Sequence, residues 1–198
     1  MTAEHAIAFL LFAFVAAITP GPSNVMLTAT GAAAGFVRGL PCLLGVAAGM
    51  GLLIFCVAMG LGQVVLGHDF ALRSFNWLGA AFLLWLAWRI ATAPPAAAAA
   101  MARPVGFVEA ALFQWINPKS WLVSVSAVGT FLQDRPQGAW LQAALFAAVF
   151  LAAALPSGLA WLAFGASLQR LLRSESAARR FNLAMGAAVA LSVLTILL

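Results

Sequence analysis

Two proline-interrupted stretches decide the fold: Ile18-Thr19-Pro20-Gly21-Pro22-Ser23-Asn24 and Ile116-Asn117-Pro118-Lys119-Ser120. Each stretch interrupts a long apolar run, and Pro20 and Pro118 are 98 positions apart in a chain of 198 residues. Proline cannot continue a helix undisturbed, because it lacks an N–H and its ring displaces the carbonyl four residues earlier. Two breaks in corresponding places of the two halves are typical of a membrane protein with an internal repeat, and they point to its binding site.

The composition around these stretches is that of a membrane protein. The chain is 65% hydrophobic and 8% charged, with a mean hydropathy of +1.05, whereas a soluble domain is about 45–50% apolar and about 25% charged. A spanning helix takes about 20 residues, so six of them use about 120. The remaining residues are too few for a catalytic or nucleotide-binding domain outside the membrane. The net charge of +5 fits basic cytoplasmic loops better than nucleic-acid binding.

Apolar runs bounded by glycine, proline and charge predict an all-α, polytopic membrane protein with six transmembrane helices. The predicted spans are 6–33, 40–66, 74–92, 106–132, 139–166 and 181–198. The breaks fall in the first and fourth spans, and three spans per half make the second half enter the membrane in the opposite direction. We therefore predict a 3+3 inverted repeat with broken helices 1 and 4. Residues 1–92 form the first repeat, 93–105 a cytoplasmic linker and 106–198 the second repeat, all within one membrane domain, 1–198.

The distribution of arginine predicts the orientation. The loops after the first, third and fifth spans hold Arg38, Arg89, Arg103, Arg170, Arg173, Arg179 and Arg180, and the loops after the second and fourth hold only Arg73 and Arg135. Because basic loops stay in the cytoplasm, we expect the odd loops inside and both termini outside, in a bacterial inner membrane. The first apolar run is expected to be a retained span rather than a cleaved signal, because Met1–His5 carries no Lys or Arg.

The breaks supply the groups of a binding site for a zwitterion. Pro20, Pro22 and Pro118 release the carbonyls of Ala16, Ile18 and Gln114, which need partners in hydrocarbon or must line a wet cavity. Each new half-helix presents unpaired N–H groups and about half a positive charge, which suit a carboxylate, while the carbonyls suit an ammonium. The alternative is two plain kinks. The predicted substrate-binding residues are Thr19, Pro20, Gly21, Pro22, Ser23, Asn24, Gln114, Asn117, Pro118, Lys119 and Ser120.

Lys119 is the strongest single candidate. It lies 13 or 14 residues from either end of its predicted span, about 20 Å along the helix, which is too far for its side chain to reach the surface. An intramembrane cation costs about 2.5–3.5 kcal/mol and marks a functional site by default. Our hypothesis is that it is a carboxylate counter-ion and a candidate for proton coupling; the other interpretation is a lysine held by released carbonyls. Glu109 is the second proton-coupling candidate, or else a solvated interfacial residue.

Other function classes lack their residues. The sequence has no CxxC, HExxH or GxSxG, and only two histidines, His5 and His68. We expect no catalytic residues, no metal site and no cofactor. Efflux of a metal or inorganic ion remains an alternative, although Glu109 is the single acidic residue near the core and divalent ions prefer several carboxylates. An intramembrane enzyme would need a Ser–Lys dyad of Ser23 or Ser120 with Lys119.

The two breaks also resemble a known family. Thr19-Pro20-Gly21-Pro22-Ser23-Asn24, the glycines 31, 35 and 39, and Asn117-Pro118-Lys119 are together similar to the LysE/RhtB family of amino-acid exporters, over essentially the whole chain. Within it, Trp77-Leu78-Gly79-Ala80-Ala81, the run from Trp85 to Thr92 and Gln169-Arg170-Leu171 resemble the cysteine/O-acetylserine exporter branch. Ser23 differs from that branch, which often has Asn there.

The resemblance implies a secondary transporter that exports neutral amino acids or their derivatives across the inner membrane, driven by the proton-motive force. Cysteine- and O-acetylserine-like or homoserine- and threonine-like substrates are implied. The residues alone predict a zwitterion site between inverted repeats, and export comes only from the resemblance. The expected partners are a small zwitterionic substrate, protons and membrane lipid, with homo-oligomerisation left open.

Overall fold

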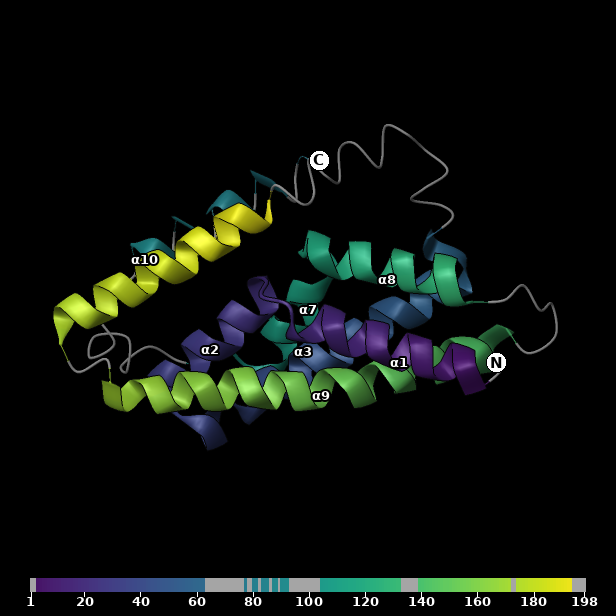
Figure 1. Cartoon of the computed structure of the whole chain (residues 1–198), viewed down its shortest axis with the longest axis horizontal. Helices are drawn as coiled ribbons and strands as arrows, with labels where there is room; N and C mark the ends of the chain where they lie inside the picture. Colours follow the sequence, from purple (N-terminus) through teal and green to yellow (C-terminus); the bar gives the residue numbers. More distant parts are fainter. Residues whose placement is uncertain are drawn as a thin grey trace.

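In a computed structural model of the chain, the described residues form helices joined by short breaks and loops, and none of them forms a β-strand (Figure 1). The described residues are 3–62, 104–132, 139–171 and 174–193, with short pieces at 77, 80–81, 83–85, 87–88 and 90–92. The helices are α1 (Ala3–Ile18), α2 (Pro22–Ala34), α3 (Phe36–Cys56), the π-helical turn η1 (Val57–Leu61), α7 (Phe107–Ile116), α8 (Pro118–Phe131), α9 (Ala139–Leu171) and α10 (Glu175–Ser192).

The lengths and apolarity of these helices fit a multi-pass membrane protein. Residues Phe36–Leu61 and Ala139–Leu168 are each long and apolar enough to cross a membrane, and α1 with α2 would make a third, bent span. α7 is apolar but shorter, with 10 residues. The six-span count stays a prediction.

Both predicted breaks are present. α1 and α2 are bent by 56° across the residues between Ile18 and Pro22. In the second half, α7 ends at Ile116 and α8 begins at Pro118, with Asn117 extended between them (φ −84°, ψ 111°). Pro22 opens α2 and Pro118 opens α8, because the missing N–H of a proline is not needed in the first turn of a helix.

The last predicted span, 181–198, begins too late. α10 begins at Glu175, because the Ser174 side chain accepts a hydrogen bond from the backbone N–H of Ala177 and caps the helix there. Arg179 and Arg180 therefore lie on a helix rather than in the preceding loop, and both are exposed. Arg38 likewise lies in the first turn of α3, which begins at Phe36 rather than at 40.

Several predictions fall outside the described residues. They include most of the third span (74–92), with Leu78, Gly79 and Arg89, and most of the linker 93–105. The charged residues of the predicted loops His68, Asp69, Arg73, Arg103, Arg135 and Arg173 also lie there. The described pieces of the third span pack beside α10: Ala80, Leu83 and Ala87 share a buried cluster with Val189 and Val193.

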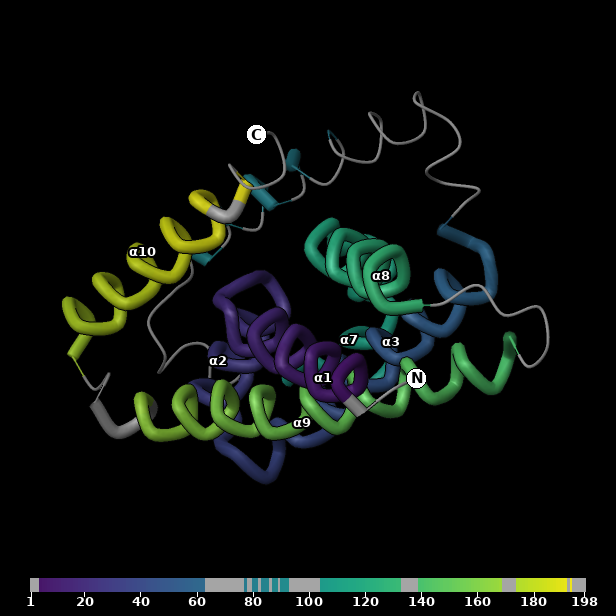
Figure 2. The backbone as a smooth tube through the Cα atoms, turned by 45° about the vertical axis from the view of Figure 1, so that its right-hand side comes forward, coloured from purple at the N-terminus to yellow at the C-terminus, as the bar shows by residue number. Residues whose placement is uncertain are grey.

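Glycines allow the broken helices to pack closely against unbroken ones. Gly31 of α2 lies against the backbone of Leu162 in α9, and Gly165 of α9 lies against the backbone of Thr28 in α2. Gly45 of α3 meets the backbone of Phe107 in α7 in the same way. A side chain at any of these positions would collide with backbone, so these glycines serve packing within the chain, as in other membrane helices. α9 accordingly lies alongside α1 and α2 in both Figure 1 and Figure 2.

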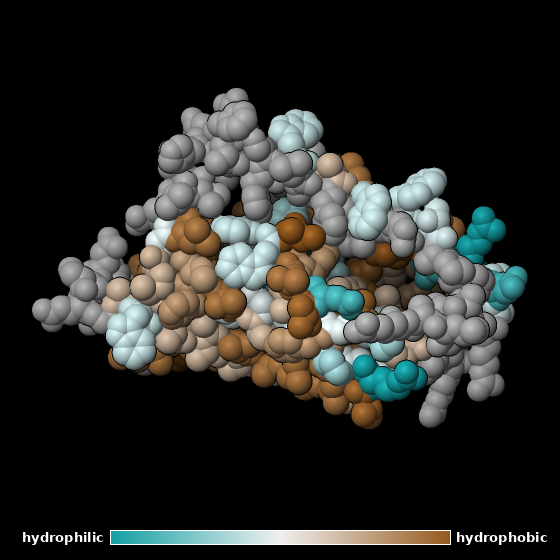
Figure 3. Space-filling view, turned by 180° about the vertical axis from the view of Figure 1, so that it is seen from behind, coloured by the Kyte–Doolittle hydropathy of each residue, from teal (hydrophilic) through white to brown (hydrophobic). Residues whose placement is uncertain are grey.

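The outer surface is apolar over much of its area. Ile7, Leu11 and Val15 of α1 are each about 60% exposed, at 60%, 60% and 59%. Figure 3 shows a largely hydrophobic face whose hydrophilic residues gather toward one end. That is the end where α9 finishes and α10 begins in Figure 1. This distribution is the one expected of a protein whose surface meets lipid.

Candidate functional site

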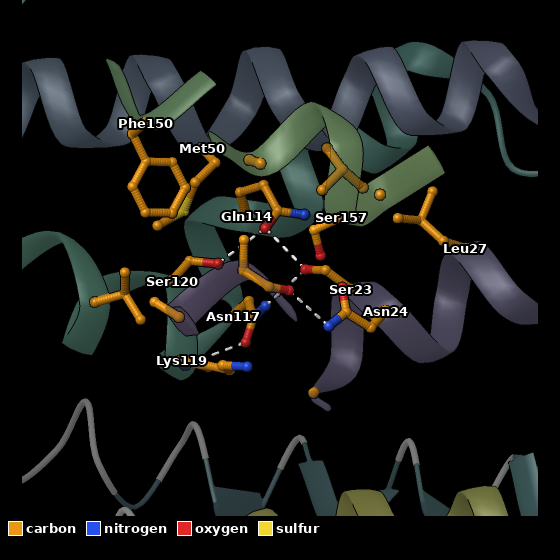
Figure 4. Close-up of a pocket in the computed structure, with 17 residues that line it drawn as sticks. Ser23, Asn24, Leu27, Met50, Gln114, Asn117, Lys119, Ser120, Phe150 and Ser157 are labelled. Carbon is orange, nitrogen blue, oxygen red and sulfur yellow. Dashed lines mark hydrogen bonds between the residues drawn. The ribbon is translucent and has the colours of Figure 1, made fainter. Parts of the chain in front are cut away.

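The two breaks meet at a cavity of about 70 Å³ (Figure 4). It is lined from the first break by Ala16, Ala17, Gly21, Ser23, Asn24 and Leu27, from the second by Gln114, Asn117, Lys119, Ser120 and Val123, and from α3 and α9 by Val46, Met50, Phe150, Ala154, Ser157 and Gly158. Pockets for drug-sized ligands measure roughly 300–1,000 Å³, so this cavity suits a much smaller molecule. Among the lining residues, all of which lie in the described part of the chain, Lys119 alone carries a charge.

Polar side chains join the two breaks across this cavity. The Ser23 hydroxyl donates to Gln114 Oε1 (2.9 Å) and accepts from Asn117 Nδ2 (3.0 Å). The Ser120 hydroxyl donates to the same Gln114 oxygen (2.9 Å), while Gln114 Nε2 donates to the carbonyl of Ala110 (3.1 Å) and so fixes the orientation of the amide. Gln114, Asn117 and Ser120 are buried. The sequence therefore predicted residues that the fold brings together from 91 and 94 positions apart.

Lys119 contacts the opposite break. Its Nζ donates to the carbonyls of Thr19 (2.5 Å) and Pro20 (3.3 Å), and its side chain runs beside Gly21, where a Cβ atom would lie 2.7 Å from Lys119 Cδ. These contacts with backbone carbonyls are the ones expected if Lys119 is a lysine held by released carbonyls. The side chain also lines the cavity, so the same ammonium holds the break in shape and gives the cavity its charge.

The other released carbonyls of the first break have side-chain partners too. Asn24 Nδ2 donates to the carbonyls of Ala17 (2.9 Å) and Thr19 (2.8 Å), and Trp161 Nε1 donates to that of Ile18 (3.2 Å). The prediction that the Ile18 carbonyl needs a new partner is confirmed. These carbonyls are already occupied, which makes them poor receptors for a substrate ammonium. Both amide hydrogens of Asn24 are used in these bonds, and Asn24 lines the cavity. Its remaining polar atom, Oδ1, can act only as an acceptor.

The two half-helices differ at their N-termini. Asn117 caps α8, since its Oδ1 accepts from the backbone N–H of Lys119 (3.1 Å). α2 follows Gly21, which has no side chain to cap it. Ser23 and Asn24 do not cap α2 either, because their side chains are engaged elsewhere. The positive end of α2 therefore lies uncapped beside the Lys119 ammonium, and an anion is favoured there.

Some predicted residues lie off the cavity. Thr19, Pro20, Pro22 and Pro118 belong to the breaks but are not among its lining residues. Glu109 is exposed in the first turn of α7, where its carboxylate accepts from the backbone N–H of Gly106 (2.8 Å). Within the described residues, no three His, Cys, Asp or Glu side chains lie close enough together to hold a metal ion.

Sequence reasoning missed the walls that come from unbroken helices. Met50 of α3 and Phe150 and Ser157 of α9 line the cavity. For Met50 and Phe150, which are apolar, the sequence does not distinguish a residue that lines a cavity from one that only packs in the core. Ser157 does carry a signal, because it is a polar residue directly after Pro156 in the middle of an apolar helix.

Comparison with known proteins decides the family. Residues 14–198, nearly the whole chain, match the LysE type translocator family. The chain belongs to the LysE family. The family is one of translocators, so this LysE protein is a transporter rather than an enzyme, and the apolar helices make it a multi-pass membrane protein.

Curated relatives cover most of this LysE protein. A cysteine/O-acetylserine efflux protein of Klebsiella pneumoniae is 34% identical over 174 residues, 86% of this chain and 87% of its own length. One from Escherichia coli O139:H28 is 30% identical over 188 residues, 93% of each chain. No solved structure gave a significant match.

Proposed function

We propose that this protein exports small neutral amino acids or their derivatives, cysteine- and O-acetylserine-like or homoserine- and threonine-like, across the bacterial inner membrane. The observation that carries the proposal is the small cavity between the two breaks, which has the Lys119 ammonium and the uncapped start of α2 on its wall. The relatives are cysteine/O-acetylserine efflux proteins, which supports this substrate class.

The substrate carboxylate binds at Lys119 Nζ and the first backbone N–H groups of α2, those of Ser23 and Asn24. A lysine ammonium has three donors, and two of them reach Thr19 and Pro20. The substrate ammonium binds at Asn24 Oδ1, whose own amide nitrogen is held by two backbone carbonyls. The cavity of about 70 Å³ favours a substrate with a small side chain.

Transport proceeds by alternating access of the two repeats, 1–92 and 106–198, around this cavity. The matched breaks support the inverted repeat. Exposed arginines lie near the start of α3 and of α10, and they support a cytoplasmic location for the starts of these two helices, with both termini outside.

The proton-motive force drives export, and Lys119 and Glu109 are the two candidates for the group that carries a coupled proton. Glu109→Gln separates them, because glutamine still accepts the Gly106 amide hydrogen bond but cannot titrate. If export by this variant keeps its dependence on a pH gradient, Lys119 is the carrier; if the dependence is lost, Glu109 is.

The test is efflux from cells preloaded with labelled cysteine, O-acetylserine or threonine. Wild type, Lys119→Ala, Ser124→Ala and empty vector are compared at matched abundance. Ser124 is the control, because it lies buried on the same helix and its hydroxyl bonds to the Ser120 carbonyl (2.7 Å), away from the cavity lining. We expect wild type and Ser124→Ala to lose label much faster than vector and Lys119→Ala to export at least ten-fold more slowly than wild type. Wild type that matches vector for every substrate would refute the proposal.

A further inference from the structure

A buried hydroxyl on α9 has no partner in the described part of the chain. Ser157 is 1% exposed, its Oγ makes no hydrogen bond, and it lines the cavity. It is the single buried side-chain polar atom left unpaired among the described residues. Native proteins rarely leave such an atom unpaired, because burying it without a partner destabilises the fold.

Serine in a helix has an easy way to avoid this situation, and Ser157 does not use it. A serine or threonine hydroxyl can donate to the carbonyl four residues earlier. Thr28, Ser124 and Ser167 all do so in this protein, at 2.9, 2.7 and 2.9 Å. In Figure 4 the Ser157 hydroxyl instead points into the cavity, toward the side where Ser23 and Gln114 lie.

We propose that Ser157 is a specificity-determining residue that binds an oxygen on the side chain of the transported amino acid. This inference rests on the proposed function. The broken helices hold the charged end of the substrate at Lys119 and α2, and Ser157 belongs to a different wall, that of the unbroken helix α9. It is therefore placed to meet the part of the substrate that distinguishes one amino acid from another.

The chemistry of the hydroxyl selects the substrate class. A serine hydroxyl donates one hydrogen bond and accepts others, so an ester or hydroxyl oxygen satisfies it well, whereas sulfur is a weak partner and a methyl group is none. Sites that contain a buried polar group discriminate against analogues that leave it unpaired. The favoured substrates are small amino acids with an oxygen in the side chain, such as O-acetylserine or serine, ahead of cysteine and of alanine.

The test compares Ser157→Ala with wild type in proteoliposomes loaded with labelled O-acetyl-L-serine, L-serine or L-alanine. Ser124→Ala again serves as the control, since it also removes a buried hydroxyl but not from the cavity. We expect Ser157→Ala to slow efflux of the two oxygen-bearing substrates roughly five-fold, the value of one hydrogen bond between neutral groups, and to leave the alanine rate as in wild type. Its melting temperature should not fall, because the hydroxyl has no partner within the protein.

The outcomes separate this inference from the proposed function. Equal slowing of all three substrates, or no change in any, would overturn the role of Ser157 while wild-type export still stands. Wild type that moves none of them would overturn the proposed function and this inference with it. Ser157→Cys, which keeps the shape and a weaker donor, should fall between wild type and Ser157→Ala, and it answers the same question if the alanine variant does not accumulate.

Discussion

Replacing Gly21 by alanine should disable transport without unfolding the protein. The backbone there is extended (φ −175°, ψ 178°), a conformation open to any residue, so the added methyl group causes no backbone strain. Its Cβ would lie 2.7 Å from Lys119 Cδ and 3.0 Å from Lys119 Nζ. These atoms belong to a flexible side chain, which will move away. The methyl group thus displaces the Lys119 ammonium from the cavity while leaving the residue itself in place.

The magnitudes follow from the contacts that are lost. A hydrogen bond from a charged group contributes about 1.5–3 kcal/mol, and Nζ makes one short bond, to the Thr19 carbonyl at 2.5 Å. Where the backbone conformation suits alanine, a Gly-to-Ala change stabilises the protein by about 0.4–1 kcal/mol, because it lowers the conformational entropy of the unfolded chain. The free energy of unfolding should therefore fall by only about 1–2 kcal/mol. Loss of the same kind of bond to a substrate carboxylate should weaken binding roughly 10- to 100-fold.

The assay is efflux of labelled O-acetylserine from proteoliposomes, with thermal unfolding measured on the same purified protein. Gly129→Ala is the matched control, because it makes the same substitution in the other broken helix, on α8, where a Cβ meets nothing within 4 Å. We expect normal export from Gly129→Ala and at least ten-fold slower export from Gly21→Ala. Wild-type export by Gly21→Ala would show that the position of Lys119 does not matter and would refute the reasoning.

Three further changes should act on the fold at graded cost. Gly165→Ala forces a side chain into the backbone of Thr28 and should lower stability by about 3 kcal/mol or more, seen as loss of folded protein in detergent. Asn24→Leu leaves the Ala17 carbonyl without its donor, whereas the Thr19 carbonyl keeps its bond from Lys119 Nζ, and should cost about 1–3 kcal/mol, measured by thermal unfolding; an unchanged melting temperature would mean that water replaces the amide. Ser174→Ala removes the cap of α10 and should cost about 0.5–2 kcal/mol with export unchanged, and a transport defect there would contradict its purely structural role.

The breaks and the polar pairing across them were predictable from the sequence because proline acts locally. Pro20 and Pro118 each remove an N–H and displace a carbonyl, and the polar residues beside them in an apolar run have few uses other than pairing or binding. Pro156 lies inside α9 without ending it, so the polar neighbours are part of the signal. The predictions for Gln114, Asn117 and Ser120 follow from that rule alone, and the structure brings all three to one cavity.

The remaining features depend on three-dimensional packing. Asn117, which directly precedes Pro118, caps its helix, whereas Asn24, two residues after Pro22, turns back to the preceding carbonyls. The identity of the residue alone does not separate these two roles. The predicted start of α10 was wrong because the low hydropathy of Arg179 and Arg180 indicated a loop. The helix in fact begins after Ser174, whose side chain caps it. Ser157 was missed because α9 has no break of its own, so a single serine after Pro156 is a weaker signal than the two paired breaks.

The central claim is that Lys119 and the start of α2 bind the carboxylate of the transported amino acid. The most direct measurement is competition in proteoliposomes, where unlabelled L-serine or L-serinamide, which lacks the carboxylate, competes with efflux of labelled O-acetylserine. Wild type should be inhibited at least ten-fold more strongly by serine than by serinamide, and Lys119→Ala, assayed through its residual efflux, should lose most of that difference. Equal inhibition of wild type by the two compounds, or an undiminished difference in Lys119→Ala, would contradict the account.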